Sequence, residues 1–530
     1  MSWKRQLFLW HRWTGIVLCL FFALWFLSGI FMMYVGFPEL TRAERFAGSQ
    51  PLRLPATALA PDEAVARLTP QDFLTKATPT AIEYLNPSAV VTARSIRLAM
   101  IAERPAYVIS ASNGAQPRVV FADNGEVLRE VTPEAAQLVA ASFVKRSGAP
   151  ASVDSIAFDA RIQTDQWTVS GLNEHRPLLR FRLNDAAGTV LYVSSTTGEV
   201  VRDTHSTERA LNYLGAVTHW IYPTFIRKYP LLWEWIVDVL SVIGVVLAVS
   251  GLWIGILRWN RRAPPGKRQV PYKGLMRWHY FTGIVFGLVT ITWVFSGLMS
   301  MNPLSINPPR RASADQQLLY SGKRLTPSDF QLPVTGFGDL AMEAELIHYD
   351  GQPFYRVTDA DMSVRLVAGA PTATRLPDWQ TMASRAPQLI PDAPLVESKL
   401  LTSYDNYFYS RHPERGDRRL PVLRVRFGDE QSTWFHLDPI TGQLLDRSTF
   451  TNRVYRWLYS GLHSFDIWWL WQRRPLWDIC VITFSLGGLL LSVIGVVIGW
   501  RRLRYKPMRR ASSRVDEIEK NSLAIRVQRS

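Results

Sequence analysis

Histidine is the residue type in this 530-residue sequence whose positions most clearly suggest chemistry. His11 and His279 open two matching segments, His-Arg-Trp-Thr-Gly-Ile-Val and His-Tyr-Phe-Thr-Gly-Ile-Val. His219 and His463 also occupy matching places in the repeat, and a Gly-xxx-Gly pair follows each of them at the same interval. A single histidine near a membrane surface is usually an ordinary polar residue, but two repeated pairs indicate a functional site.

Two histidines that approach from opposite sides can hold a haem iron between their imidazole rings. We therefore predict that His11, His279, His219 and His463 are axial ligands of one or two haems. Structural zinc is a poor alternative because it needs four clustered nitrogen or sulfur ligands. The two cysteines, at positions 19 and 480, lie in separate apolar segments and cannot complete such a cluster.

Arginines and glycines near these histidines suit the same prediction. Arg12, Arg277, Arg209 and Arg453 can pair with haem propionates, although Arg12 and Arg277 can equally be basic residues at the cytoplasmic membrane surface. Several glycines let a flat group or a neighbouring helix approach closely, and ordinary small-residue helix packing explains them equally well. These glycines are Gly15, Gly251, Gly255, Gly283, Gly495 and Gly499.

Four apolar segments must position these residues. They cover Thr14–Val35, Trp235–Leu257, Phe281–Met301 and Ile479–Trp500. A bilayer core about 30 Å thick needs roughly 20 helical residues, so each segment can span a membrane. Along such a helix, Ser28 lies about 25 Å beyond His11. Histidines at opposite ends of the helices therefore define an inner and an outer pair.

The net charge of +16 is concentrated beside these segments. Thirteen Lys and Arg residues lie in 258–277 and at the start of the tail. Because basic short loops stay in the cytoplasm, we predict that both termini and the central loop are inside, and we assign no nucleic acid partner. The predicted parts are helices at 1–35, 231–257, 278–301 and 476–500, outer domains at 36–230 and 302–475, a basic loop at 258–277 and a tail at 501–530.

The repeat continues through the outer segments and predicts two duplicated halves, each with an α+β extracytoplasmic domain. Alternating residues predict strands at Leu178–Leu183 and Thr189–Val193, then a turn and a strand at Glu199–Arg202. The second copy predicts strands at Val422–Phe427, Trp434–Leu437 and Gln443–Leu445. Helices are expected at 62–76 and 132–146, and Ser206 is expected to cap a helix that ends near His219.

The sequence resembles the PepSY-associated transmembrane family over nearly its whole length. The resemblance rests on the His-Arg-Trp-x-Gly opening at residue 11, the turns Thr-Thr-Gly-Glu-Val at 196–200 and Ile-Thr-Gly-Gln-Leu at 440–444, and a histidine before the next helix. The family includes inner-membrane ferric-siderophore reductases that use haem b. The resemblance therefore implies a bacterial inner-membrane protein whose outer domains are PepSY-like and periplasmic.

These observations favour a haem-containing electron carrier that reduces a periplasmic ferric chelate, by resemblance a ferric siderophore. No G-x-G-x-x-G or P-loop pattern occurs, so the electron donor is a separate quinol or cytoplasmic reductase. Two alternatives remain open. PepSY domains resemble peptidase-inhibitory modules, which allows a sensor or protease regulator. An iron-siderophore transporter is the second, and the lack of charged residues in the middle of the spans counts against it.

Overall fold

The computed structural model describes residues 2–73, 93–111, 114–148, 152–262, 264, 269–416 and 418–504. These residues fall into two compact units. The first unit comprises Met1–Leu27, Val242–Val294 and Ile482–Ser530, and the second comprises Ser28–Ser241 and Phe295–Val481. The first unit is built from long helices, and the second contains all the strands of the described residues.

Four long helices are present in the described residues, and each is long and apolar enough to cross a membrane. They are α1 (Trp3–Met32), α9 (Pro230–Arg258), α10 (Leu275–Ser300) and α16 (Leu476–Arg504). Along α1, the exposed apolar residues recur at intervals of three and four, from Trp10 and Trp13 to Leu24 and Leu27. Such a stripe lies on one helix face, which suits contact with lipid. The four predicted helices are therefore confirmed, and the chain is a membrane protein.

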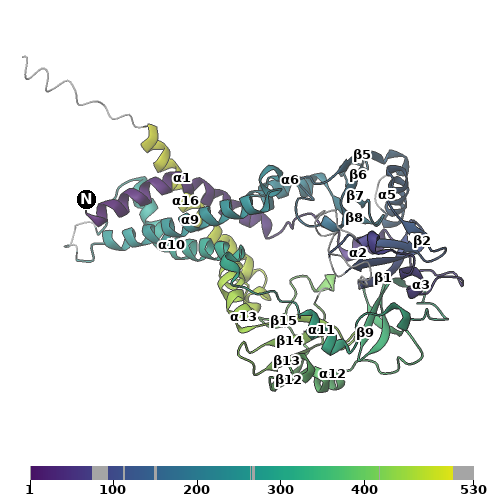
Figure 1. The fold of residues 1–530 in the computed structure, drawn as a ribbon. Coiled ribbons are helices and arrows are strands. Elements are labelled where there is room, and N and C mark those ends of the chain that lie inside the picture. Colours follow the sequence, from purple (N-terminus) through teal and green to yellow (C-terminus); the bar gives the residue numbers. More distant parts are fainter. Residues whose placement is uncertain are drawn as a thin grey trace, which may run out of the picture. The chain divides into compact units, whose positions relative to one another are not determined.

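Glycines bring these four helices into close contact within the first unit. A β-carbon on Gly488 of α16 would lie 2.3 Å from the Phe26 ring of α1. A β-carbon on Gly255 of α9 would lie 2.8 Å from Ile284 of α10. Packing of this kind associates membrane helices, because lipid supplies no hydrophobic force between them. Figure 1 shows α1, α9, α10 and α16 grouped together.

The second unit contains a seven-stranded antiparallel sheet with the order β11-β10-β9-β1-β2-β3-β4. Its centre is the pairing of β1 with β9, in which Leu98 lies opposite Ala344. The sheet therefore joins a segment before the central basic loop to a segment after it, and residues of both segments form one apolar core. Its strands are β1 (Ala93–Ile101), β2 (Arg104–Ala111), β3 (Arg118–Phe121), β4 (Val127–Leu128), β9 (Ala341–Tyr349), β10 (Gln352–Asp359) and β11 (Val364–Ala368).

Two four-stranded antiparallel meanders complete the sheets of this unit. The first has β5 (Ala157–Ile162), β6 (Leu178–Arg182), β7 (Val190–Ser194) and β8 (Val200–Thr204). The second has β12 (Leu395–Leu401), β13 (Val422–Phe427), β14 (Trp434–Leu437) and β15 (Leu444–Ser448). Their last three strands follow the same order at matching places in the repeat, and the strands predicted there are present within three residues of the expected ends.

Short helices cover and connect these sheets. Helix α5 packs its buried face, including Ala140 and Val144, on the first meander, and Met382 of α12 packs on the second. The other short helices lie in the loops and after each meander. The short α-helices of this unit are α2 (Arg42–Ala47), α3 (Pro61–Val65), α5 (Pro133–Ser147), α6 (Ser206–Leu214), α7 (Ala216–His219), α8 (Thr224–Arg227), α11 (Ala314–Ser321), α12 (Trp379–Arg385), α13 (Phe450–Arg456), α14 (Leu462–Ser464) and α15 (Trp468–Trp471).

Two helix predictions need correction. The expected helix at 62–76 is a short helix, α3, followed by one 3-10 turn at Pro70–Phe73, and residues 74–76 lie outside the described residues. The expected single helix from Ser206 to His219 is two helices, because the backbone breaks at Gly215 with φ −93° and ψ −107°. His205, and not Ser206, occupies the N-cap position of α6.

A buried cluster of four charges stabilises the junction between β1 and β9. Arg97 of β1 donates to Glu199 at 2.7 Å, and Arg45 of α2 donates to Glu343 of β9 at 2.7 Å. Burial alone would raise the pKa of Glu199, but the Arg97 and Arg45 guanidinium groups lower it to about 2. Alternating charges of this kind satisfy one another where a single buried charge would be costly.

Candidate functional site

The structure brings each predicted histidine pair together. His11 of α1 and His279 of α10 have ring centroids 6.5 Å apart and ring planes at 43°. His219 at the end of α7 and His463 in α14 have ring centroids 5.9 Å apart and planes at 73°. The first pair belongs to the helical unit and the second pair belongs to the sheet-containing unit. We call them the inner and the outer pair.

Hydrogen bonds from α9 orient the ring of His11. Its Nδ1 lies 3.2 Å from the carbonyl oxygen of Leu247 and 3.2 Å from the Ser250 hydroxyl. A carbonyl oxygen only accepts, so this contact places the proton on Nδ1. The lone pair then lies on Nε2, the nitrogen that can bind a metal. A partner of this kind fixes the tautomer and ring orientation of metal-binding histidines in proteins.

The second member of the inner pair is held less completely. The carbonyl of Leu491 in α16 takes the place that Leu247 has for His11. However, Nδ1 of His279 is buried and has no partner at hydrogen-bonding geometry among the described residues. Ile494 occupies the place in the second copy that Ser250 has in the first, so no hydroxyl is available there. The two inner histidines therefore differ in their support, although their positions correspond.

Each histidine of the outer pair is contacted by a serine hydroxyl. Ser28 Oγ lies 3.1 Å from Nδ1 of His219, and Ser296 Oγ lies 3.1 Å from Nδ1 of His463. Each serine follows an inner histidine at the same interval, Ser28 on α1 and Ser296 on α10. Each of these long helices thus carries an inner histidine and the hydroxyl that positions an outer one. In the sequence the two serines stand out only as landmarks of the repeat, so their role was missed there.

An irregular helix precedes each outer histidine. On the first side, Gly215 interrupts the chain between α6 and α7, four residues before His219. On the second side, a single π-helical turn covers Trp457–Gly461, directly before α14 and His463. Single π-turns inside α-helices are rare and occur often at functional sites. Each irregularity interrupts the regular helix just before the segment that carries the outer histidine.

Glycines give the histidine rings their space. A β-carbon on Gly251 would lie 2.6 Å from Cε1 of His11, which is closer than side chains allow. Gly495 faces His279, and a β-carbon there would lie 3.7 Å from Cε1. In the outer pair, Gly29 faces His219 in the same manner at 3.5 Å. The remaining singled-out glycines, Gly15, Gly255, Gly283 and Gly499, face apolar side chains and serve helix packing.

Both pairs fit the requirements of bis-histidine haem ligation. An imidazole nitrogen binds a metal at about 2 Å, so each ring centroid lies roughly 3 Å from the metal and opposed rings have centroids about 6 Å apart. The observed separations of 6.5 Å and 5.9 Å lie on either side of this value. The hydrogen bonds to Nδ1 of His11, His219 and His463 add the second requirement, a fixed ring orientation.

The four arginines singled out in the sequence have other contacts. Arg12 and Arg277 are exposed and stack on Trp13 and Phe281, as basic residues at a membrane surface do. Arg209 donates to the carbonyl oxygens of Thr204 and Gly188.

Arg453 donates to the corresponding carbonyls of the second copy, those of Ser448 and Ser432. Arg209 and Arg453 therefore fasten a helix to its meander, and these contacts give no support to the prediction that they bind propionates. Propionate binding by Arg209 and Arg453 therefore stays a prediction.

The five unrepeated histidines all lie in the sheet-containing unit, and their partners are ordinary ones. His348 bonds to Asp329 at 2.9 Å. His436 accepts an N–H from Arg424 at 2.8 Å, and burial lowers its pKa. His175 lies 3.1 Å from Ser194 Oγ. Among the described residues, no group of three or more His, Cys, Asp or Glu side chains forms a metal-binding cluster. The two repeated pairs are thus a separate class of histidine.

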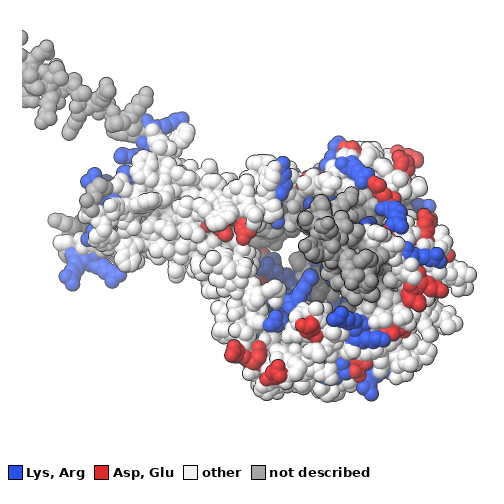
Figure 2. Space-filling model, viewed as in Figure 1, with Lys and Arg blue, Asp and Glu red and all other residues white. Residues whose placement is uncertain are grey.

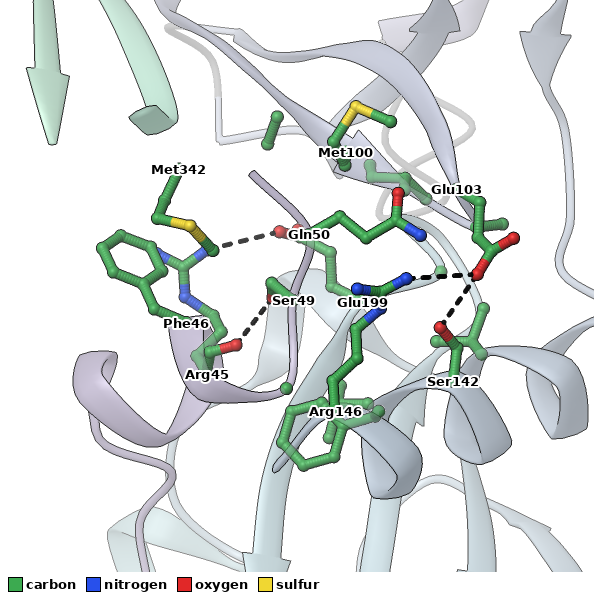
Figure 3. A pocket seen from close by; sticks show the side chains of 18 residues that line it. Arg45, Phe46, Ser49, Gln50, Met100, Glu103, Ser142, Arg146, Glu199 and Met342 are labelled. Carbon is green, nitrogen blue, oxygen red and sulfur yellow. Dashed lines mark hydrogen bonds and ion pairs between the residues drawn. The ribbon is translucent and has the colours of Figure 1, made fainter. Parts of the chain in front are cut away.

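One small cavity lies between α2, α5 and the β1–β2 hairpin. Figure 3 shows Arg146 and Ser142 of its wall reaching the same carboxylate, that of Glu103. Its volume is about 60 Å³. That volume holds a few water molecules, whereas sites for small organic ligands are several times larger. We therefore assign no ligand to this cavity.

Comparison with known proteins gives one family. The model described as the PepSY-associated TM region matches residues 8–353. The matched range contains His11, His219 and His279, and His463 lies beyond it. No curated protein and no solved structure gives a significant match.

Proposed function

The chain belongs to the PepSY-associated TM region family, and we propose that it is a haem-containing electron-transfer protein of the bacterial inner membrane. In this proposal it reduces a ferric chelate, such as a ferric siderophore, on the periplasmic side. Reduction releases iron because Fe²⁺ binds hard oxygen ligands less tightly than Fe³⁺. The electron comes from a separate quinol or cytoplasmic reductase.

One observation carries this proposal. Two histidine pairs that the sequence repeats meet at centroid separations of 6.5 Å and 5.9 Å. Haem b held by each pair would supply a one-electron centre whose potential the surrounding protein sets. His11, His279, His219 and His463 would be its axial ligands. The Leu247 carbonyl would keep the His11 ring in the tautomer that leaves Nε2 for the iron, and the Ser28 hydroxyl would hold the His219 ring at Nδ1.

The proposal includes an arrangement in two repeated halves. The meander strands, the helix-fastening arginines and the outer histidines all recur at matching places in the two copies. In the proposed orientation, both termini and the 258–277 loop are cytoplasmic and the sheets are periplasmic. Figure 2 shows charged side chains scattered over the part of the molecule that contains the sheets, whereas the helical part carries few, apart from a small acidic group and the basic residues at the end that bears the N-terminus in Figure 1.

Reporter fusions test the orientation. Fusions of a reporter that is active only in the periplasm are expected to be active at Ala47 and Ser321 and inactive at Pro264. The physical reason is that thirteen Lys and Arg residues lie in the 258–277 loop and at the start of the tail, and basic segments of this kind stay in the cytoplasm. A cytoplasm-only reporter should give the reverse pattern at the same positions. An active periplasmic reporter at Pro264 would overturn the orientation.

The inner site is sensitive to one β-carbon. Gly251→Ala is expected to displace the His11 ring and to lower the haem content toward half, because the new atom would meet Cε1 at 2.6 Å. Gly283→Ala is the control, since its β-carbon would meet Leu491 at an ordinary 3.7 Å. Alanine otherwise favours a helix by about 1 kcal/mol over glycine, so a loss is steric. Haem-to-protein ratios of both variants measure the effect, and equal ratios would contradict the assignment.

The absorption spectrum of the purified protein tests the proposal as a whole. A Soret band with a haem-to-protein ratio near two, which ferric chelate oxidises after dithionite reduction, is the expected result. A colourless protein, purified from cells supplied with haem precursor, would contradict the electron-transfer function. It would favour the sensor or peptidase-regulator function that PepSY-like domains also allow.

A further inference from the structure

A cavity of about 360 Å³ lies beside the second meander, six times the volume of the one in Figure 3. Its volume falls within the range of sites for small organic ligands. Among the described residues, no carboxylate side chain lines the cavity, and tyrosine and serine hydroxyls complete the wall. We call it the arginine cavity, because six arginines line it: Arg310, Arg411, Arg415, Arg418, Arg453 and Arg456.

Arg456 is the least satisfied of these arginines. Its side chain is buried, with 8% exposed. One of its nitrogens donates to the carbonyl oxygen of Asp466. Its Nε and Nη1 atoms are buried and have no hydrogen-bond partner among the described residues. Leaving charged donors unpaired inside a protein is costly. Arg456 is among the residues that line the cavity, so an acceptor bound there would lie beside a guanidinium group that the fold leaves partly unpaired.

The charge balance of the cavity favours an anion. Arg310 pairs with Asp446, and Arg411 lies 3.1 Å from Asp466. Arg453 binds backbone carbonyls and stacks on Trp434 at 4.1 Å, and burial lowers its pKa. Two buried guanidinium groups, those of Arg453 and Arg456, thus form no ion pair with a carboxylate among the described residues. A ligand with several carboxylates would neutralise them through paired N–H···O bonds.

Most arginines of the cavity have no arginine at the matching place in the first copy. Asn212 occupies the place in the first copy that Arg456 has in the second. The β12–β13 loop carries four arginines, at 411, 415, 418 and 419, whereas the β5–β6 loop carries only Arg176. Helix fastening alone does not explain the additional arginines, because Arg209 performs that task in the first copy without them. The second copy therefore has an added function.

The cavity adjoins the outer histidine pair. Ser460 lines it and lies in the π-helical turn, three residues before His463. Arg411 of the cavity wall donates to Ser464 Oγ at 2.9 Å, directly after that histidine. A ligand in the arginine cavity would therefore lie against the segment that positions His463. This is the place where an electron acceptor is required.

We propose that the arginine cavity binds the acceptor, and that the acceptor is a polycarboxylate ferric chelate of the citrate class. This inference rests on the proposed function, which supplies the electron. It narrows the substrate class from ferric chelates in general to anionic ones bound through carboxylates. Arg456 and Arg453 are the specificity-determining residues, and the chelate binds there before any electron moves.

Calorimetric titration with gallium(III) citrate tests the proposal without any redox step, because gallium(III) is not reduced. The full-length protein is expected to bind it, with affinity that falls as salt increases. Arg456→Asn gives the second copy the residue of the first and should weaken binding roughly 10–100-fold. Arg453→Gln should weaken it by at least about tenfold. Arg209→Gln removes the same helix fastening in the first copy and should leave binding unchanged.

Haem content and thermal unfolding, measured on the same samples, separate the possible failures. A haem-loaded wild type that does not bind gallium citrate would overturn this inference and leave the proposed function intact. If Arg456→Asn folds normally but loses haem, the inference would also be overturned. The Arg456 guanidinium would then pair with haem propionates and not with the ferric chelate. Binding by a colourless protein would support the anion site while contradicting the proposed function. Equal weakening by Arg209→Gln would show that only the fold was disturbed and would count against the inference.

Discussion

Replacing His219 or His463 by alanine is expected to remove one of two haems and to abolish reduction of extracytoplasmic ferric chelate. The two ring centroids lie 5.9 Å apart, so the proposed haem needs both histidines as ligands. Loss of an outer-shell partner of a metal ligand costs roughly 10–100-fold in affinity or activity, and loss of the ligand itself should cost more. The measurements are the haem-to-protein ratio and the rate of ferric chelate reduction in membranes.

A matched control comes from the same unit. His205→Ala removes a half-exposed histidine that does not recur and whose ring lies near the Thr189 hydroxyl and the Asp203 carboxylate. It should keep full haem content and activity. Full haem occupancy in both His219→Ala and His463→Ala would rule these residues out as ligands. A loss shared equally by the His205→Ala control would point to damage of the fold instead.

The inner pair leads to a different expected result. His11→Ala or His279→Ala should leave about half of the haem, and dithionite should still reduce it. Electron delivery from the physiological donor should fail, because in the proposed orientation the remaining haem would lie on the other side of a bilayer core about 30 Å thick. The outer pair belongs to a separate compact unit, so its geometry should survive the change. Donor-driven and dithionite-driven reduction, measured side by side, give the comparison.

The control for the inner pair is Arg277→Gln, at an exposed residue that stacks on Phe281 and lies two residues before His279. Its haem content should not change. If the His11→Ala, His279→Ala double variant keeps wild-type haem stoichiometry and donor-driven reduction, the protein holds a single haem. The quinone pool would then be the donor, since quinol can reach an outer centre without an inner one.

The apolar runs determined the four long helices by themselves. A run of about 20 apolar residues specifies a spanning helix through local composition alone, and α1, α9, α10 and α16 follow. The histidine pairs were also predictable. Residues at matching places in a repeat face each other when the copies pack around a shared axis, and the rings of both pairs meet.

The seven-stranded sheet, which joins a segment before the central basic loop to a segment after it, could be seen only in the tertiary structure. Pairing of β1 with β9 sets Arg97 opposite Glu345, and no local pattern encodes a partner so distant along the chain. The same holds for the roles of the arginines. Arg209 looks like a charged group available for a ligand, but folding brings the backbone carbonyls of Thr204 and Gly188 to it. The sequence shows that a guanidinium group is present, and only the fold decides which groups satisfy it.

Arg456, in contrast, is an arginine whose donors the fold does not fully satisfy. In the sequence it is one basic residue in a chain of net charge +16, with nothing to distinguish it. Folding buries it beside the arginine cavity and leaves two of its nitrogens without a hydrogen-bond partner among the described residues. Residue type and spacing thus determined the membrane helices and the histidine pairs, because helix formation and repeat symmetry are encoded along the chain. Burial and hydrogen-bond satisfaction depend on residues far apart in sequence, so the arginine cavity emerged only from the tertiary structure.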